Sequence, residues 1–225
     1  MPVNPKYLAK FEYGSIYHIY NKTNNRELLF RSDENNFHFL NLFRNYVSPF
    51  VETYAWNLLP NHFHFLVRIR QETEIMGFIN NLLPENQTKS EKLYLLDGNI
   101  NNLIQMEFKR FFTAYAMSFN NFYKRKGNLF YRTFRRVKIG KDHQFTLAII
   151  YIHANAQKHK LVRQFDKYRW TSFHILISEK PTILLRDEIL QWFGGKDMFL
   201  KTQYALTEYY YCFENSIEVE EDDSL

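Results

Sequence analysis

Two histidines stand one residue apart in the stretch LLPNHFHFLVRI, at positions 62 and 64. Every second residue of this stretch is apolar, as in a β-strand with one buried face: Phe63, Phe65, Val67 and Ile69. His62 and His64 share the opposite face with Leu66 and Arg68. Successive positions on one face lie roughly 7 Å apart, so both imidazoles could approach one ion. Because His-x-His pairs are also common in packing and on surfaces, a metal site needs a third ligand from elsewhere.

A second set of chemically capable residues lies on a helix expected over residues 143–160. Tyr151, Asn155 and His159 are spaced four residues apart, which places them on one side of the helix. An apolar stripe beside them would face the core: Phe145, Ala148, Ile149, Ile152 and Ala156. The row is either a solvated helix face or part of a site, and its spacing leaves both interpretations open.

Residues 119–141 interleave cations with aromatic rings. The cations are Lys124, Arg125, Lys126, Arg132, Arg135, Arg136, Lys138 and Lys141. The rings after Gly127 are Phe130, Tyr131 and Phe134. Cations contact phosphates and aromatic faces stack on unpaired bases, so we expect DNA contact here, against the alternative of an ordinary strand with solvated charges. Arg68, on the histidine face, is either a phosphate clamp or a charge at the rim.

Composition limits the class of protein. The chain has 225 residues, of which 18% are aromatic, so it can bury a substantial core. Its single cysteine, Cys212, excludes internal disulfides and four-cysteine zinc sites. The first residues contain no apolar signal region, and no run approaches 18 apolar residues. We therefore expect a cytoplasmic protein without a membrane partner.

The net charge of +5 is unevenly distributed. The last twelve residues hold six acidic side chains and no Lys or Arg, which leaves 29 basic and 18 acidic residues, a charge of +11, in the rest. Such a basic body favours a polyanionic partner, most often nucleic acid, over a merely soluble basic protein. The acidic end, residues 214–225, is expected to be a disordered tail.

The pattern of elements predicts an α+β fold. Strands are expected at 15–22, 51–59, 62–70 and 129–139, with a hairpin turn at Pro60 and Asn61. Helices are expected at 32–47, 102–125 and 143–160, and residues 71–101 form an insertion with one short helix. The order gives a ferredoxin-like βαββαβ sandwich with an antiparallel sheet, followed by a further helix. We assign 1–160 to this core and 161–213, with a helix near 186–193, to an extension packed on it.

Five motifs resemble one family in the same order. PNHFHFLV and YIHANAQKH are similar to motifs of the REP-associated tyrosine transposases, relatives of single-strand transposases within the HUH endonuclease superfamily. YHIYNKTNNRELLF, FTAYAMSFNNFYKRKGNLFYRTFRRV and YRWTSF resemble further segments of that family, and EILQWFGG follows them. The resemblance thus spans nearly the whole chain.

The resemblance implies specific roles for four residues. His62 and His64 would bind a divalent metal, Mg²⁺ or Mn²⁺, and Asn155 would complete the metal shell. Tyr151 would attack a DNA phosphodiester. The family's usual Asn-Pro is Asn-Ala here, at 155 and 156, so we expect the helix to continue toward Lys160.

The expected function is that of a nickase and strand transferase acting on single-stranded or hairpin DNA through a phosphotyrosine intermediate. A replication or conjugation nickase of the same superfamily is a second enzymatic interpretation, disfavoured by a motif with only two histidines. A catalytically silent hairpin-DNA-binding protein is the non-enzymatic alternative. Both a monomer and a homodimer that shares the tyrosine between subunits remain open.

Overall fold

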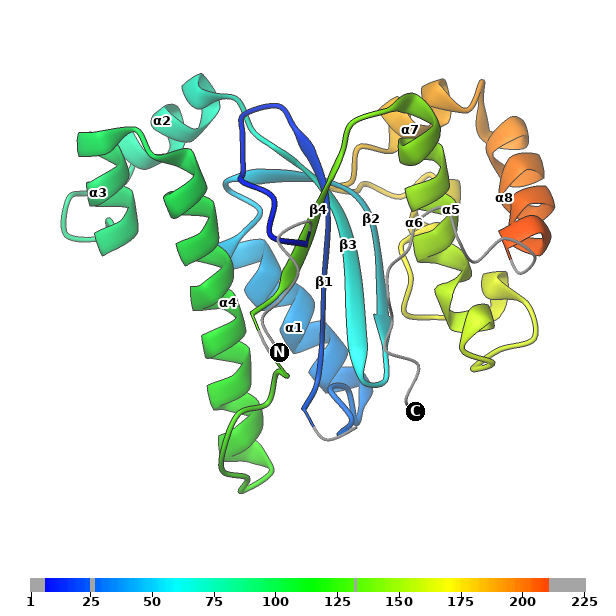
Figure 1. Ribbon diagram of the computed structural model, residues 1–225, viewed down its shortest axis with the longest axis horizontal. Helices are drawn as coiled ribbons and strands as arrows, with labels where there is room; N and C mark the ends of the chain where they lie inside the picture. Colours follow the sequence, from blue (N-terminus) through cyan, green and yellow to red (C-terminus); the bar gives the residue numbers. More distant parts are fainter. Residues whose placement is uncertain (1–6, 25–26, 132, 211–225) are drawn as a thin grey trace.

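A four-stranded antiparallel sheet forms the centre of the computed structural model, which describes residues 7–24, 27–131 and 133–210 (Figure 1). The strands are β1 (Ile16–Lys22), β2 (Val51–Leu59), β3 (His62–Ile69) and β4 (Arg135–Ile139). Their order across the sheet is β2-β3-β1-β4, and every neighbouring pair is antiparallel. The predicted α+β class with an antiparallel sheet is confirmed.

Helices cover both faces of this sheet. They are α1 (Asp33–Tyr46), α2 (Glu72–Asn80), α3 (Lys89–Asp97), α4 (Ile100–Phe122), α5 (Asp142–Lys158), α6 (Phe173–Ile177), α7 (Arg186–Trp192) and α8 (Lys196–Tyr210), with a 3₁₀ turn, η2 (Phe165–Lys167). Figure 1 shows α1 and α4 on one side of the sheet and α5 on the other, with α8 beyond it. None of the helices in the described ranges is long and apolar enough to cross a membrane.

Aromatic packing fixes the register of β3. The apolar face predicted from its alternation is fully buried, and its rings meet α1. Phe65 stacks on Phe43 with ring centroids 4.2 Å apart, and Phe63 lies 5.0 Å from Phe39. A slip of one residue would exchange these phenylalanines for the histidines, so the core side of the sheet determines which way the imidazoles point.

Two expectations about the elements are wrong in detail. The strand predicted at 129–139 is regular only in β4, and the preceding residues form an isolated antiparallel bridge, Thr23 with Phe130, at the end of β1. There Tyr131 donates its N–H to Lys22 over 3.0 Å, and Asn24 donates to the Leu129 carbonyl over 2.8 Å. The insertion at 71–101 contains two helices, α2 and α3, in place of one.

The outer edge of β2 is covered by the segment YRWTSF. Leu58 donates its N–H to the Trp170 carbonyl, and Ser172 donates its N–H to the Trp56 carbonyl, each over 2.9 Å. The Ser172 hydroxyl also accepts the N–H of Trp56 at 2.9 Å. An exposed strand edge invites pairing with other chains, so this segment closes the sheet on that side.

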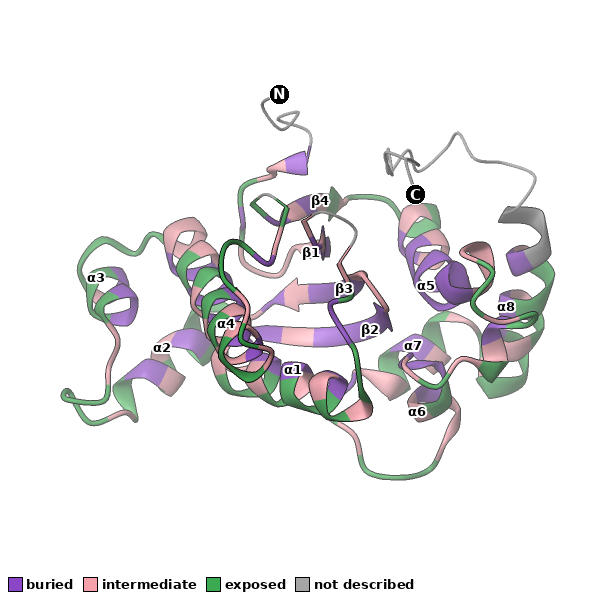
Figure 2. Ribbon diagram, turned by 90° about the horizontal axis from the view of Figure 1, so that it is seen from below, coloured by how far each residue is buried: buried purple, intermediate pink, exposed green. Residues whose placement is uncertain are grey.

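A buried histidine links this segment to α5 and α8. His153 contacts the Ser172 hydroxyl through Nε2 at 3.0 Å and the Gln203 side chain through Nδ1 at 3.1 Å. Burial lowers the pKa of His153 to about 4, so this imidazole is neutral at physiological pH. Figure 2 shows the buried stretch of α5 between the sheet and α8.

The proposed domain boundaries stay predictions, and the acidic tail lies outside the described residues.

Candidate functional site

The site is built on the sheet face that α5 covers. Cross-strand pairing places Tyr20 opposite His64 and Lys22 opposite His62 on neighbouring strands β1 and β3. Arg135 of β4 lies beside Tyr20, and Asn57 of β2 lies beside His64. The centre of this face is therefore polar and aromatic, whereas the other face is packed with phenylalanine.

The row of residues predicted on one side of α5 faces the two histidines of the same chain. The Tyr151 ring meets the His64 ring edge-on, with centroids 5.5 Å apart. Asn155 Oδ1 lies 3.3 Å from His62 Nε2, and the His159 ring lies 4.9 Å from the His62 ring. Tyr151 is only 6% exposed and Asn155 is fully buried, so this row is not a solvated helix face.

Helix α5 runs past position 156, where the sequence has alanine and not proline. Asn155 is followed by three further helical residues, and the chain leaves the helix at Lys160, whose φ is 57°. The helix thus continues through Ala156, as predicted, and carries Lys158 past the site. Its Nζ lies 5.5 Å from the centre of the Tyr151 ring.

His62, His64 and Asn155 lie next to one another between β3 and α5, with the two imidazole centroids 5.2 Å apart. Nδ1 of His62 contacts Asn61 Oδ1 at 2.7 Å, and Nδ1 of His64 contacts His18 Nε2 at 2.9 Å. With Nδ1 engaged in both rings, Nε2 is the nitrogen that each could offer to a metal. Asn155 adds its Oδ1.

The Asn155 amide lies directly beside His62. An amide oxygen accepts only, so Asn61 requires a proton on His62 Nδ1, which leaves a lone pair on Nε2. Asn155 Oδ1 lies 3.3 Å from His62 Nε2, and Asn155 Nδ2 is buried without a hydrogen-bond partner. As a set of donor atoms, two imidazoles with an amide oxygen suit Mg²⁺ or Mn²⁺. Across the described residues, no cluster of three or more His, Cys, Asp or Glu side chains could hold a metal.

Several residues of this face were not singled out from the sequence. His18 and Tyr20 of β1 and Asn57 of β2 lie around His64. The rings of His18 and Tyr20 stack on each other and on His64, and the Asn57 amide donates to the backbone of α5. The alternation in YHIYNK puts His18 and Tyr20 on one face of a strand, but only the pairing of β1 with β3 brings them to His64.

The cations expected to contact DNA have different surroundings. Arg136 is buried, donates from Nε to the Ala9 carbonyl over 2.7 Å and lies over two phenylalanine rings. Arg136 is thus packed inside the protein, and its expected contact with DNA stays a prediction. Arg125 donates to the carbonyls of Gly127 and Asn128 and pairs with Glu27, which holds the turn after α4.

The remaining cations of this group lie nearer the surface. Lys124 and Lys126 are exposed, Lys138 pairs with Glu12, and Arg135 lies 5.0 Å from the Tyr7 ring and 5.8 Å from the Tyr20 ring. Arg132 lies outside the described residues. DNA contact by these side chains stays a prediction.

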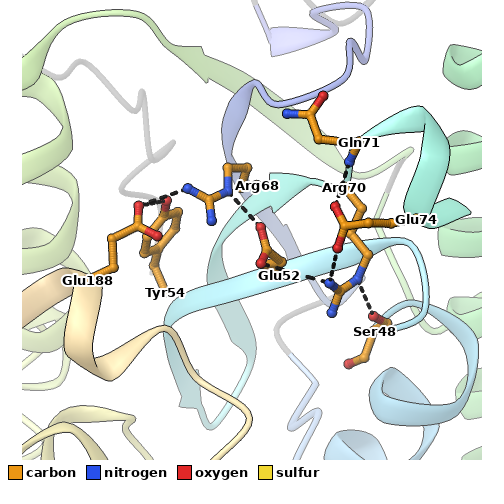
Figure 3. Close-up of polar contacts among 8 residues, drawn as sticks. All are labelled: Ser48, Glu52, Tyr54, Arg68, Arg70, Gln71, Glu74 and Glu188. Carbon is orange, nitrogen blue, oxygen red and sulfur yellow. Dashed lines mark hydrogen bonds and ion pairs between the residues drawn. The ribbon is translucent and has the colours of Figure 1, made fainter.

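Arg68 belongs to a polar cluster at the far end of β3 (Figure 3). Its guanidinium contacts Glu52 at 2.7 Å and Glu188 of α7 at 2.8 Å. The Tyr54 hydroxyl donates to Glu188 over 2.5 Å, and burial together with this hydrogen bond raises the pKa of Tyr54. Two carboxylates would compete with any phosphate for Arg68, and the cluster ties α7 to the sheet.

Comparison with known proteins identifies a similar fold. A solved structure of a REP-associated tyrosine transposase bound to a REP hairpin matches this chain with a TM-score of 0.50 and 16% sequence identity. The match covers 77% of this chain and 86% of that one. No family model and no curated protein matches the sequence. The structure therefore confirms the resemblance carried by the motifs at the level of the fold.

Proposed function

We propose that the protein nicks and rejoins single-stranded or hairpin DNA through a covalent phosphotyrosine at Tyr151. The observation that carries this proposal is the edge-on contact of Tyr151 with His64, at 5.5 Å between ring centroids within one chain. A nucleophile and a candidate metal ligand are thereby held against each other. The fold shared with a transposase bound to hairpin DNA supports the substrate class.

The proposed reaction exchanges one phosphodiester for another. The Tyr151 oxygen attacks phosphorus, the phenol loses its proton, and the bond from phosphorus to the 3′ oxygen breaks. The departing oxygen takes up a proton, which leaves a 3′ hydroxyl on one DNA end and a 5′ phosphotyrosine on the other. The reverse attack rejoins the strand without a high-energy cofactor. About a thousandth of an ordinary tyrosine is ionised at neutral pH, so nearby positive charge such as Lys158 would help to form the phenolate.

His62, His64 and Asn155 would hold the divalent ion of this site. Such an ion supplies positive charge that polarises the scissile phosphate. The protein's own contribution is to hold the two imidazole rings and the Asn155 amide together, with the His64 ring against Tyr151. Because Tyr151 and the histidines meet within one chain, this arrangement supports a site that is complete in a monomer, and a homodimer is not required.

We also interpret the sheet, from its β2-β3-β1-β4 order, as ferredoxin-like.

One observation favours the alternative of a silent hairpin-binding protein. Tyr151 is almost fully buried, so little of this side chain is accessible to a DNA phosphate in the structure. In a protein that only binds hairpins, the same ring would simply be part of the packing between α5 and β3.

An adduct assay separates the two functions. Purified protein is incubated with Mn²⁺ and end-labelled hairpin oligonucleotides, and covalent complexes are resolved on a denaturing gel. The proposal expects an adduct from the wild type and none from Tyr151→Phe. Tyr204→Phe is the matched control, because it removes a hydroxyl that contacts Asp166 away from the site. An equal adduct from Tyr151→Phe would remove the nucleophile assignment. Hairpin binding without any adduct from the wild type would establish the silent alternative.

A further inference from the structure

His18 contacts both the histidine strand and the tyrosine of the candidate site. It lies on β1, is 2% exposed, and its Nε2 is 2.9 Å from His64 Nδ1. Its ring stacks on Tyr20 with centroids 4.9 Å apart and lies edge-on to Tyr151 at 5.9 Å. His18 is thus packed among the side chains that must be aligned, and its Nε2 contacts a candidate metal ligand.

The hydrogen bond between two neutral imidazoles can be arranged in two ways. If His18 donates, His64 accepts through Nδ1 and carries its proton on Nε2, where the proton blocks coordination. If His18 accepts, His64 carries its proton on Nδ1 and presents a lone pair on Nε2. Only the second arrangement leaves His64 ready to bind a metal in the neutral protein.

The contact made by the neighbouring histidine fits the second arrangement. His62 Nδ1 lies 2.7 Å from the side-chain oxygen of Asn61, and an amide oxygen accepts only, so this contact matches a ring protonated at Nδ1. A partner on Nδ1 that fixes tautomer and ring direction is typical of metal-binding histidines. The same pattern for His64 requires His18 to be the acceptor.

We infer that His18 is a positioning residue that holds the proton of His64 on Nδ1 and thereby presents His64 Nε2 to a divalent ion. The inference rests on the proposed function, in which His64 is a metal ligand. Through its edge contact with Tyr151, the same ring also aligns the tyrosine with the metal-binding face of the sheet.

The tautomer of His64 can be measured without metal or DNA. Nitrogen-15 shifts of the imidazole rings distinguish a protonated from an unprotonated Nδ1. We expect an Nδ1–H tautomer for His64 in the metal-free wild type and in His18→Gln, whose side-chain oxygen can replace the accepting nitrogen. His18→Phe keeps a ring but offers no acceptor, so its His64 should shift toward the Nε2–H tautomer.

Manganese affinity provides the second readout. Changes to the partner of a metal-binding histidine typically cost about 10-fold to 100-fold in affinity, and we expect a loss of that size for His18→Phe. His18→Gln should retain most of the affinity. Tyr17→Phe is the matched control: it removes a buried hydroxyl from the other face of β1, bonded to the Lys10 carbonyl at 2.7 Å, and should leave Mn²⁺ binding unchanged.

The outcomes distinguish this inference from the proposed function. An Nε2–H tautomer for His64 in the metal-free wild type would overturn the role of His18, whatever the protein does to DNA. Unchanged Mn²⁺ affinity in a folded His18→Phe protein would overturn it as well. If His64 is the Nδ1–H tautomer and depends on His18, but the wild type binds no Mn²⁺, the positioning stands and the metal-dependent function fails.

Discussion

The side-chain amide of Asn57 on β2 donates a 2.6 Å hydrogen bond to the carbonyl of Ile152 in the middle of α5. Ile152 directly follows Tyr151 and precedes Asn155 by less than one helical turn. Asn57 also lies opposite His64 in the sheet. One buried amide therefore connects the helix that carries the candidate nucleophile to the strands that carry the candidate metal ligands.

Replacing Asn57 by leucine should weaken both the fold and the site. The substitution removes a buried hydrogen bond, and we expect the free energy of unfolding to fall by about 1–3 kcal/mol in urea titrations. Because α5 loses its attachment beside His64, Mn²⁺ affinity should fall as well. Asn36→Leu is a matched control on α1, where a buried amide donates to the Ser32 carbonyl over 3.1 Å. It should destabilise the protein without changing Mn²⁺ binding, and an equal loss of affinity in both variants would contradict the prediction.

The oxygen of Asn155 can be tested by two substitutions of similar size. Asn155→Leu removes the acceptor that faces His62 Nε2 at 3.3 Å, and we expect Mn²⁺ affinity to fall on the order of tenfold or more. Asn155→Asp keeps an oxygen and adds a negative charge, so it should bind Mn²⁺ at least as tightly as the wild type. Calorimetric titration of both variants gives the comparison. Wild-type affinity in a folded Asn155→Leu protein would exclude Asn155 from the metal shell.

Much of the fold could be predicted because its signals are local. The hairpin of β2 and β3 lies where the turn at Pro60 and Asn61 and the period-two alternation of Phe63 and Phe65 place it. The second helix of the insertion, α3, also has local signals, since Thr88 and Glu91 form a capping box and Gly98 ends the helix with φ 63°. These capping residues mark both ends of α3 in the sequence itself.

The remainder of the site depends on contacts between distant segments. His18 reaches His64 only through the pairing of β1 with β3, across 46 positions of sequence. Arg136 shows the converse: its sequence neighbours suggest a basic surface, but a hydrogen bond to Ala9 and two phenylalanine rings place it inside the protein. Alternation identifies the face of a strand, whereas the partners of that face follow from the tertiary structure.

Substitution of Arg68 tests whether this side chain forms an internal ion pair or contacts a DNA phosphate. Arg68→Gln breaks the contacts to Glu52 and Glu188, and for such partly exposed pairs we expect a loss of no more than about 1 kcal/mol in unfolding free energy. If the cluster is structural, hairpin-DNA affinity and its dependence on salt should be unchanged in fluorescence anisotropy. A phosphate clamp would instead give weaker binding and a salt slope smaller by about one. Glu188→Gln serves as the control, because it loosens the same cluster without removing a cation.

Burial of Glu107 should make the free energy of unfolding depend on pH, independently of the candidate functional site. This carboxyl is buried on α4, where desolvation raises its pKa although Ser90 and Arg110 contact it at 2.6 Å and 2.5 Å. A carboxyl with a raised pKa in the folded state contributes stability that is present below its unfolded pKa and is lost as pH rises through the folded value. The unfolding free energy of the wild type relative to Glu107→Gln should therefore be higher at pH 4 than at pH 7. Urea titrations at both values measure the difference, with exposed Glu85→Gln as the control for the loss of one carboxylate. A difference that grows toward pH 7 would show that the contacts with Ser90 and Arg110 outweigh the cost of burial.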